Sequence, residues 1–417
     1  MAAALILAGA SLSFAPPLAA LAPRAALHRA PLIAPALRAP AATLLVDDPV
    51  AVTSTLVSFA DQGNNLAGIF FQASLLPYVL FLYFLGYEGN RTPKLAMFGH
   101  QFLLLFVIST VFTGIVTKSV YTSSLADVDW LHGSAEALLT TSNLMVGLGY
   151  RGAIAGDADP EGGSFRYPAF GIFGLVVLVT AIGPSVLGLA QHDAFLAGIG
   201  NLDANPLEAL GLALRDEPVN ALSIPTWAIH FSSVFEWLFA MGMVTQYAKT
   251  TGNPRWKWLT YGMLPLHMSG VAACTYHFFF NSADVKTLVE LQAGTTLLGN
   301  TTVFIAALLL ALSNGWTLAD ANPVPKVMAM INKEEPPEPA EAEPPAPLVT
   351  QEVVGMPLYA AELVLATVVA SYVMKYGMGE VPIAFEPNAI VGWAICLAIP
   401  ALVGYRFVNV PNPAAEA

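Results

Sequence analysis

Nine apolar stretches dominate this sequence, and each is long enough to cross a membrane as a helix. About 20 residues of α-helix span a hydrocarbon core about 30 Å thick. The stretches lie at approximately 66–85, 95–117, 131–149, 169–190, 222–245, 258–280, 288–312, 358–374 and 389–408. Of 417 residues, 56% are hydrophobic and only 11% are charged, more apolar side chains than a water-soluble fold can bury. The sequence therefore predicts an all-α, polytopic transmembrane protein of about nine spans.

The first 46 residues have a different composition. They are rich in Ala, Pro and Leu, contain three arginines, and hold no acidic residue before Asp47. Such a composition is typical of a targeting segment. The start MAAALILAGASLS, followed by Phe14, resembles the two-part leaders of algae with secondary plastids. We therefore expect residues 1–46 to be a plastid-targeting leader that takes no part in the fold.

An internal repeat divides the spans into units. The tripeptide Ala-Asp-Val occurs at 126–128 and again at 283–285, and with the same spacing Asn143 matches Asn300. Two similar segments of three spans each, 66–151 and 222–312, thus predict two parallel three-helix repeats. The span at 169–190 would then cross the membrane between them.

The remaining segments follow from composition. The Pro- and Glu-rich tract at 332–351 cannot bury a core and predicts a disordered linker. It separates a C-terminal two-helix membrane segment at 354–408 from the rest. Gly183-Pro184 predicts a kink in the middle of the fourth span. Because most connecting Lys and Arg residues fall on one side of a nine-span topology, we expect the mature N-terminus on the lumenal side.

Four ionisable residues of the second unit are candidates for a site, because such groups are costly inside a bilayer. They are His230 and Glu236 on one span and His267 and His277 on the next. Counted from the turn at Asn253, His230 should lie level with His277, and Glu236 level with His267. Level imidazoles suit axial binding of a haem or of chlorophyll magnesium, whereas a carboxylate beside an imidazole suits a proton relay. Hydrogen bonds that only join helices are the structural alternative.

A second polar group lies on one face of the third span. Its members, spaced by three or four residues, are His132, Glu136, Thr140, Asn143 and Gly147. Only the asparagine persists in the second unit, as Asn300. We expect this stripe to face the bundle interior or a partner, and we expect Asp127 and Asp129 to cap the N-terminus of this helix.

Other chemistry has little support in the sequence. No phosphate-binding glycine loop, nucleophile elbow or paired-histidine zinc helix occurs. An intramembrane enzyme would need a clustered metal site, which the spacing of the seven histidines does not predict. The net charge of −12 argues against a nucleic-acid partner. We therefore expect a protein that is not an enzyme.

Two segments resemble known families. Residues 222–312, through LSIPTWAIHFSSVFEW and LPLHMSGVAACTYHFFFN, resemble a membrane family of hypothetical chloroplast reading frames (Ycf-like). Residues 68–151, through TPKLAMFGHQFLLLFV and SLADVDWLHGSAEALLTTSNLMVGLGYR, are similar to a sister family of unknown function. The resemblance implies an oxygenic-photosynthesis lineage and a plastid membrane, and it brings no activity with it.

Lineage and buried histidines together lead to two hypotheses. The first is a thylakoid protein, rather than one of the inner envelope, that supports the biogenesis or organisation of photosynthetic complexes and holds a haem or pigment. The second is a proton-coupled transporter of small solutes or ions. The expected partners are the lipid bilayer and, in the first hypothesis, photosynthetic membrane complexes.

Overall fold

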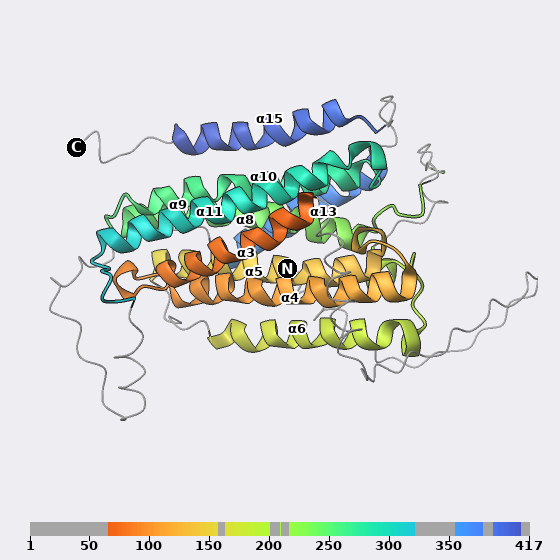
Figure 1. Ribbon diagram of the computed structural model, residues 1–417, viewed down its shortest axis with the longest axis horizontal. Coiled ribbons are helices and arrows are strands. Elements are labelled where there is room, and N and C mark those ends of the chain that lie inside the picture. Colours follow the sequence, from red (N-terminus) through yellow and green to blue (C-terminus); the bar gives the residue numbers. More distant parts are fainter. Residues whose placement is uncertain are drawn as a thin grey trace, which may run out of the picture.

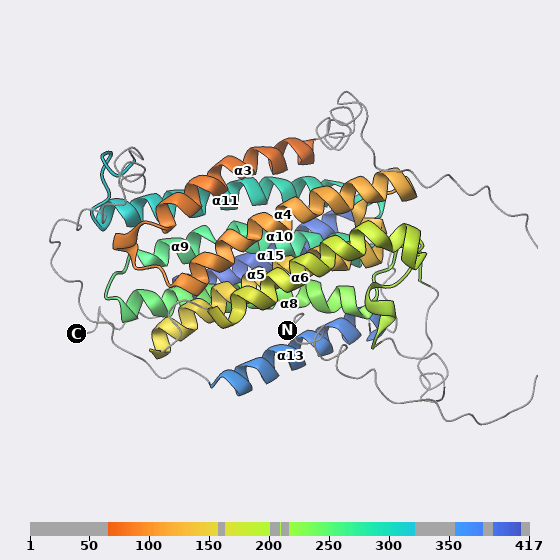
Figure 2. The ribbon, with the colours of Figure 1, turned by 90° about the horizontal axis from the view of Figure 1, so that it is seen from below.

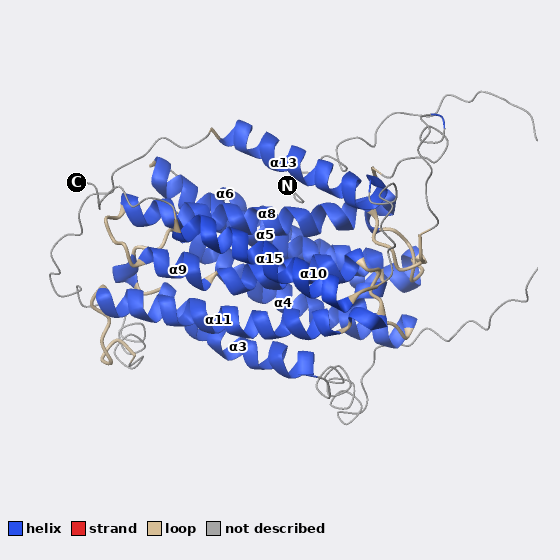
Figure 3. Cartoon of the chain, turned by 90° about the horizontal axis from the view of Figure 1, so that it is seen from above, coloured by secondary structure: helices blue, strands red, loops and turns tan. Residues whose placement is uncertain are grey.

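The computed structural model describes residues 66–156, 163–200, 209, 217–321, 355–377 and 387–409. Within these ranges the chain is helical and contains no strand (Figure 3), so the predicted all-α fold is confirmed. The expected leader at 1–46 and the expected linker at 332–351 lie outside the described residues.

The long helices run side by side along the longest axis of the molecule (Figure 1). The first unit contains α3 (Leu66–Leu85), α4 (Lys94–Tyr121) and α5 (Asp129–Ala155), and α6 (Gly163–Ile182) follows it. The second unit contains α8 (Ile224–Thr250), α9 (Trp256–Gly262), α10 (Leu264–Phe278) and α11 (Thr287–Ser313). The C-terminal helices are α13 (Met356–Tyr372) and α15 (Ala389–Val408). Short 3₁₀ turns lie at Glu88–Asn90, Leu125–Asp127, Phe195–Gly198 and Ala283–Val285, and π-helical turns at Gly183–Leu187 and Val373–Gly377.

Seven helical segments of the described chain are long and apolar enough to cross a membrane, which makes this a membrane protein. The other two predicted spans, 131–149 and 258–280, correspond to α5 and to α9 with α10. α5 has 27 residues but carries many polar ones, and most of its side chains are buried against other helices. α10 has only 15 residues and is covered by α15 (Figure 1). α5 thus falls short by its polarity, and α10 by its length.

Two proline positions interrupt helices. α6 begins at Gly163, so Gly183 and Pro184 stand at its end and form a π-helical turn there. The prediction of a kink in the middle of the fourth span is therefore wrong. The second break, at Met263, separates α9 from α10 just before Pro265, whose ring cannot continue the helix. The indole nitrogen of Trp237 donates to the Met263 carbonyl (3.2 Å) and satisfies one acceptor at this break.

The two units are interleaved instead of lying next to each other. α5 of the first unit packs along α8 of the second, and α11 of the second packs along α3 of the first (Figure 2). The asparagine common to both units lies at each contact. Asn143 Nδ2 donates to the Ser233 carbonyl (3.3 Å) and hydroxyl (3.0 Å), and Asn300 Nδ2 donates to the Ser74 carbonyl (3.0 Å). The third helix of each unit is thus fixed to the first helix of the other.

The C-terminal helices extend this bundle on two different sides (Figures 1 and 2). α13 packs on α8, where the rings of Tyr359 and Phe239 stack with centroids 4.0 Å apart. α15 packs on α10, and the Trp393 indole nitrogen donates to the Thr287 hydroxyl (3.2 Å). Both helices therefore belong to the same packed body as the two units.

Close packing of α4 on α5 provides a test of the bundle. A Cβ at Gly149 would lie 2.2 Å from the Ala96 nitrogen, so Gly149→Ala must push the helices apart. We expect a loss of about 1–3 kcal/mol of stability, the usual cost of overpacking a core. Thermal unfolding in mild detergent, followed by circular dichroism, measures it. The matched control is Gly171→Ala on α6, where a Cβ meets nothing within 4 Å; equal melting of the two variants would contradict this packing.

Candidate functional site

Three buried histidines from three helices meet near one end of the bundle. They are His132 on α5, His230 on α8 and His277 on α10. The ring centroids are 5.0 Å apart for His132 and His230, 4.7 Å for His132 and His277, and 4.8 Å for His230 and His277. One ring nitrogen from each lies within 4.8 Å of the others. We call these residues the histidine cluster.

The structure combines residues that the sequence placed in two separate groups. His230 and His277 lie level, as the count from the Asn253 turn predicts. His132 was expected on the polar stripe of α5, with no indication of which helix that stripe faces. Two other stripe members now show that it faces α8, because the Thr140 hydroxyl donates to the Ile229 carbonyl (3.2 Å) and Asn143 binds Ser233. The packing of α5 on α8 therefore adds the third imidazole.

Asn281 orients two of the three rings. It follows α10 in a left-handed conformation (φ 59°), which asparagine tolerates, and its side chain returns toward His277 one turn earlier. Asn281 Nδ2 donates to the Ala126 carbonyl (3.0 Å) and to Asp127 Oδ1 (2.8 Å). Its Oδ1 must then accept from His277 Nδ1, at 2.7 Å. The Ala126 carbonyl also lies 3.5 Å from His132 Nδ1.

These hydrogen bonds determine which nitrogens remain for a ligand. Because Nδ1 of His132 and of His277 faces an acceptor, Nδ1 carries the proton and Nε2 keeps its lone pair. His230 Nε2 is buried and has no hydrogen-bond partner among the described residues. A buried polar atom without a partner is costly. A bound cation would give this atom a partner.

The donor set fits a transition-metal ion. Imidazole suits zinc, copper, iron and nickel, and metal-bound histidines commonly donate their other nitrogen to a carbonyl or carboxyl group, as His132 and His277 do here. Zinc binds histidine nitrogen at about 2.0–2.1 Å. The nitrogens, which lie within 4.8 Å of one another, need only small side-chain movements to close on one ion. The spacing of the histidines along the sequence did not predict this cluster.

A haem or chlorophyll does not fit at this position. A porphyrin held between His230 and His277 would have to pass between rings whose centroids are 4.8 Å apart. It would also occupy the space of His132, which lies against both. The rings therefore leave no space for a porphyrin bound between His230 and His277.

The predicted pair of Glu236 and His267 is not formed. Glu236 is completely buried, and its Oε1 accepts from the Ser232 hydroxyl (2.8 Å) on the same helix. Neither ring nitrogen of His267 has a hydrogen-bond partner among the described residues. Glu136 of the stripe is half-buried. Asn300 donates to the Ser74 carbonyl on α3 and is not part of the cluster. Of the predicted site residues, the structure thus brings His132, His230 and His277 together in the cluster.

Asp127 and Asp129 join helices, and the expectation that they cap α5 is wrong. Val128 stands at the N-cap position of α5, where no side-chain hydrogen bond is made. Asp129 accepts from the backbone nitrogens of Phe195 (2.8 Å) and Ser223 (3.1 Å), the latter at the start of α8. Asp127 holds Asn281 after α10. The two carboxylates therefore set α8 and α10, with their histidines, against α5.

Asp129→Asn tests this positioning. An amide group offers a single acceptor oxygen, so one of the two buried backbone nitrogens loses its partner at a cost of about 1–3 kcal/mol. We expect a correspondingly lower midpoint of thermal unfolding. Asp284→Asn, a change at an exposed carboxylate, is the matched control and should leave the midpoint unchanged. An Asp129 variant as stable as this control would contradict the role.

Comparison with known proteins finds two families, each matching a different part of the chain. A family described as "Protein of unknown function (DUF3593)" matches residues 67–155, and one described as "Protein of unknown function (DUF2499)" matches residues 221–309. The chain is 49% identical over 89 residues to a "Ycf49-like protein" of Synechocystis sp., covering 21% of this chain and 86% of that one. It is 35% identical over 91 residues to "Uncharacterized protein ycf49" of Cyanophora paradoxa, covering 22% of this chain and 89% of the relative. No solved structure matches the chain. By these relatives, which it covers almost completely, the chain belongs to the Ycf49-like family.

Proposed function

We propose that this protein binds one transition-metal ion inside a membrane bundle, through His132, His230 and His277. The observation that supports this function is the meeting of three buried imidazoles from three helices, with one ring nitrogen of each within 4.8 Å of the others. Nδ1 of His277 bonds to Asn281, and Nδ1 of His132 lies 3.5 Å from the Ala126 carbonyl. The neutral imidazoles leave the charge of a divalent ion uncompensated, and the carboxylates of Asp127 and Asp129 nearby offset it.

We further propose that the protein works in the thylakoid membrane and supports the biogenesis or organisation of photosynthetic complexes. The Cyanophora paradoxa and Synechocystis relatives support an origin in the photosynthetic lineage, and the apolar helices support the membrane. A plastid destination also agrees with the composition of residues 1–46. In this role the metal would be a resident of the protein, held by buried side chains of three helices.

Two other functions make different use of the same residues. Proton-coupled transport depended on Glu236 beside His267, and those two side chains do not form a hydrogen bond. Transport of the metal ion itself keeps its support, because the cluster lies at one end of the bundle. Catalysis is favoured by the number of ligands, since three histidines leave a fourth position on zinc for water or a substrate. Uptake of Zn²⁺ into proteoliposomes would favour transport over a resident ion.

Metal content tests the proposed function directly. The protein is purified in mild detergent and dialysed against Zn²⁺, and its zinc content is then measured by mass spectrometry. We expect one zinc ion per chain. His230→Ala and His277→Ala should lose it, because two imidazoles bind zinc far more weakly than three. Asn281→Ala should keep the ion but bind it about 10–100-fold more weakly, the usual effect of losing a group that orients a ligand.

The matched control is His100→Ala. This imidazole on α4 is equally buried and also has a nitrogen without a hydrogen-bond partner among the described residues, but it lies outside the cluster. It should bind zinc as the wild type does. The proposal would be contradicted if every one of these variants bound zinc as the wild type does. It would also be contradicted if the wild type itself bound no zinc.

The physiological role has its own test. Cells that lack the protein should accumulate less of the photosynthetic complexes, as measured on native gels of thylakoid membranes. The wild-type chain should restore them, the His277→Ala chain should not, and His100→Ala should. Normal complexes in the absence of the protein would overturn this role while leaving the metal site intact.

A further inference from the structure

A polar cavity lies next to the histidine cluster at the same end of the bundle. It has a volume of about 110 Å³. Its charged or ionisable lining side chains are Asp127, Asp129, His192 and Lys375, and the loop at 219–223 forms the rest of the wall with Ala194. Two carboxylates in one small cavity attract cations, and among the described residues Lys375 is the lysine that lines it.

Only a thin layer of polar atoms separates this cavity from the cluster. Asp127 lines the cavity and accepts from Asn281 Nδ2, while Asn281 Oδ1 accepts from His277 on the inner side. The Ala126 carbonyl, which also accepts from Asn281, faces His132 Nδ1. One hydrogen-bonded side chain, Asn281, thus connects Asp127 at the cavity with His277 of the cluster. In the cluster, His230 Nε2 is buried and has no hydrogen-bond partner in the described chain.

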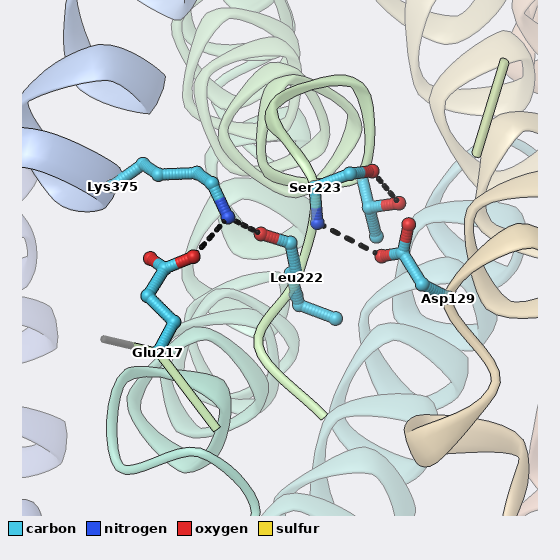
Figure 4. A network of polar contacts seen from close by, with 6 residues as sticks. Asp129, Glu217, Leu222, Ser223 and Lys375 are labelled. Atoms are coloured by element: carbon cyan, nitrogen blue, oxygen red, sulfur yellow. Dashed lines mark hydrogen bonds and ion pairs between the residues drawn. The ribbon is translucent and has the colours of Figure 1, made fainter. Parts of the chain in front are cut away.

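The ammonium group of Lys375 is held at the cavity by two acceptors. Figure 4 shows its nitrogen between the carboxylate of Glu217 (2.6 Å) and the carbonyl of Leu222 (2.9 Å). The backbone N–H of the next residue, Ser223, donates to Asp129. Two consecutive residues, Leu222 and Ser223, therefore connect the lysine with the carboxylate. The Lys375 side chain is 10% exposed. It belongs to the π-helical turn that follows α13, a helix outside both three-helix units.

We propose that the polar cavity is the access route by which a divalent cation reaches the histidine cluster, and that Lys375 is its gate. This inference rests on the proposed metal site. A metal ion that enters the cavity meets oxygen ligands from Asp127 and Asp129 before it meets nitrogen ligands, an order that replaces bound water step by step. The ammonium group occupies the cavity with a like charge, so the ion passes only when Lys375 moves away from Leu222 and Glu217.

Rates of metal exchange test the gate. Zn²⁺ is mixed with the metal-free full-length protein in detergent, and loading is followed by competition with a chromophoric zinc indicator. Release is followed by mixing the loaded protein with excess chelator. We expect Lys375→Met, which keeps the length and removes the charge, to accelerate both loading and release by about tenfold or more. Lys375→Arg should keep the slow wild-type rates.

Two further variants keep the test decisive if Lys375→Met does not fold. Glu217→Gln removes one anchor of the ammonium group and should also accelerate both rates. Lys286→Met, at an exposed lysine that follows the turn after α10, is the matched control and should exchange zinc at the wild-type rate. All variants should hold the same amount of zinc at equilibrium.

The outcomes separate this inference from the metal site on which it rests. Wild-type protein that holds no zinc at equilibrium overturns the proposed function. Normal zinc content with rates equal to the Lys286 control in every variant overturns the access route. Faster loading with slower release overturns the gate, because it would mean that the lysine only lowers the affinity of the cluster through its charge.

Discussion

The hydrogen bonds of Asp127 and Asp129 are the contacts on which the arrangement at this end of the bundle depends. Polar groups in a membrane protein must find partners within the protein, since lipid offers none. Asp129 accepts from backbone nitrogens beside α8 and in the loop before it, and Asp127 accepts from Asn281 after α10. Each bond also fixes the distance of a histidine-bearing helix from α5. The three imidazoles meet because two carboxylates, two residues apart, hold the helices that carry them.

Much of this fold follows from the amino-acid sequence. Apolar length alone locates the helices that face lipid, since each must match the thickness of the hydrocarbon core. The helix count from Asn253 is sufficient to set His230 level with His277, because the rise per residue is constant. It fails for Glu236 and His267, since a level position says nothing about rotation around the helix. The Ser232 hydroxyl, one turn away on the same helix, bonds one oxygen of Glu236, and the other oxygen has no hydrogen-bond partner among the described residues.

The contacts between units could not be predicted in the same way. The stripe on α5 shows that this helix has a polar face, but many helices of the bundle could accept it. Its position against α8 is determined by packing, as the close contact of Gly147 with Phe239 illustrates: a Cβ there would lie 2.6 Å from the ring. Asp127 and Asp129 were read as caps because they precede a helix. Their true partners, Asn281 and Ser223, are distant in sequence and become neighbours only after folding.

The interleaving of the two units has a consequence for shorter proteins of this type. α8 finds its polar partners on α5, and α11 finds one on α3, so neither unit satisfies its own asparagine. Residues 221–309, which one family model matches, hold two of the three clustered histidines. A polypeptide limited to the second unit would expose these groups to lipid and would lack an equivalent of His132. It must therefore obtain them from another subunit, and fusion in one chain makes that assembly independent of protein concentration.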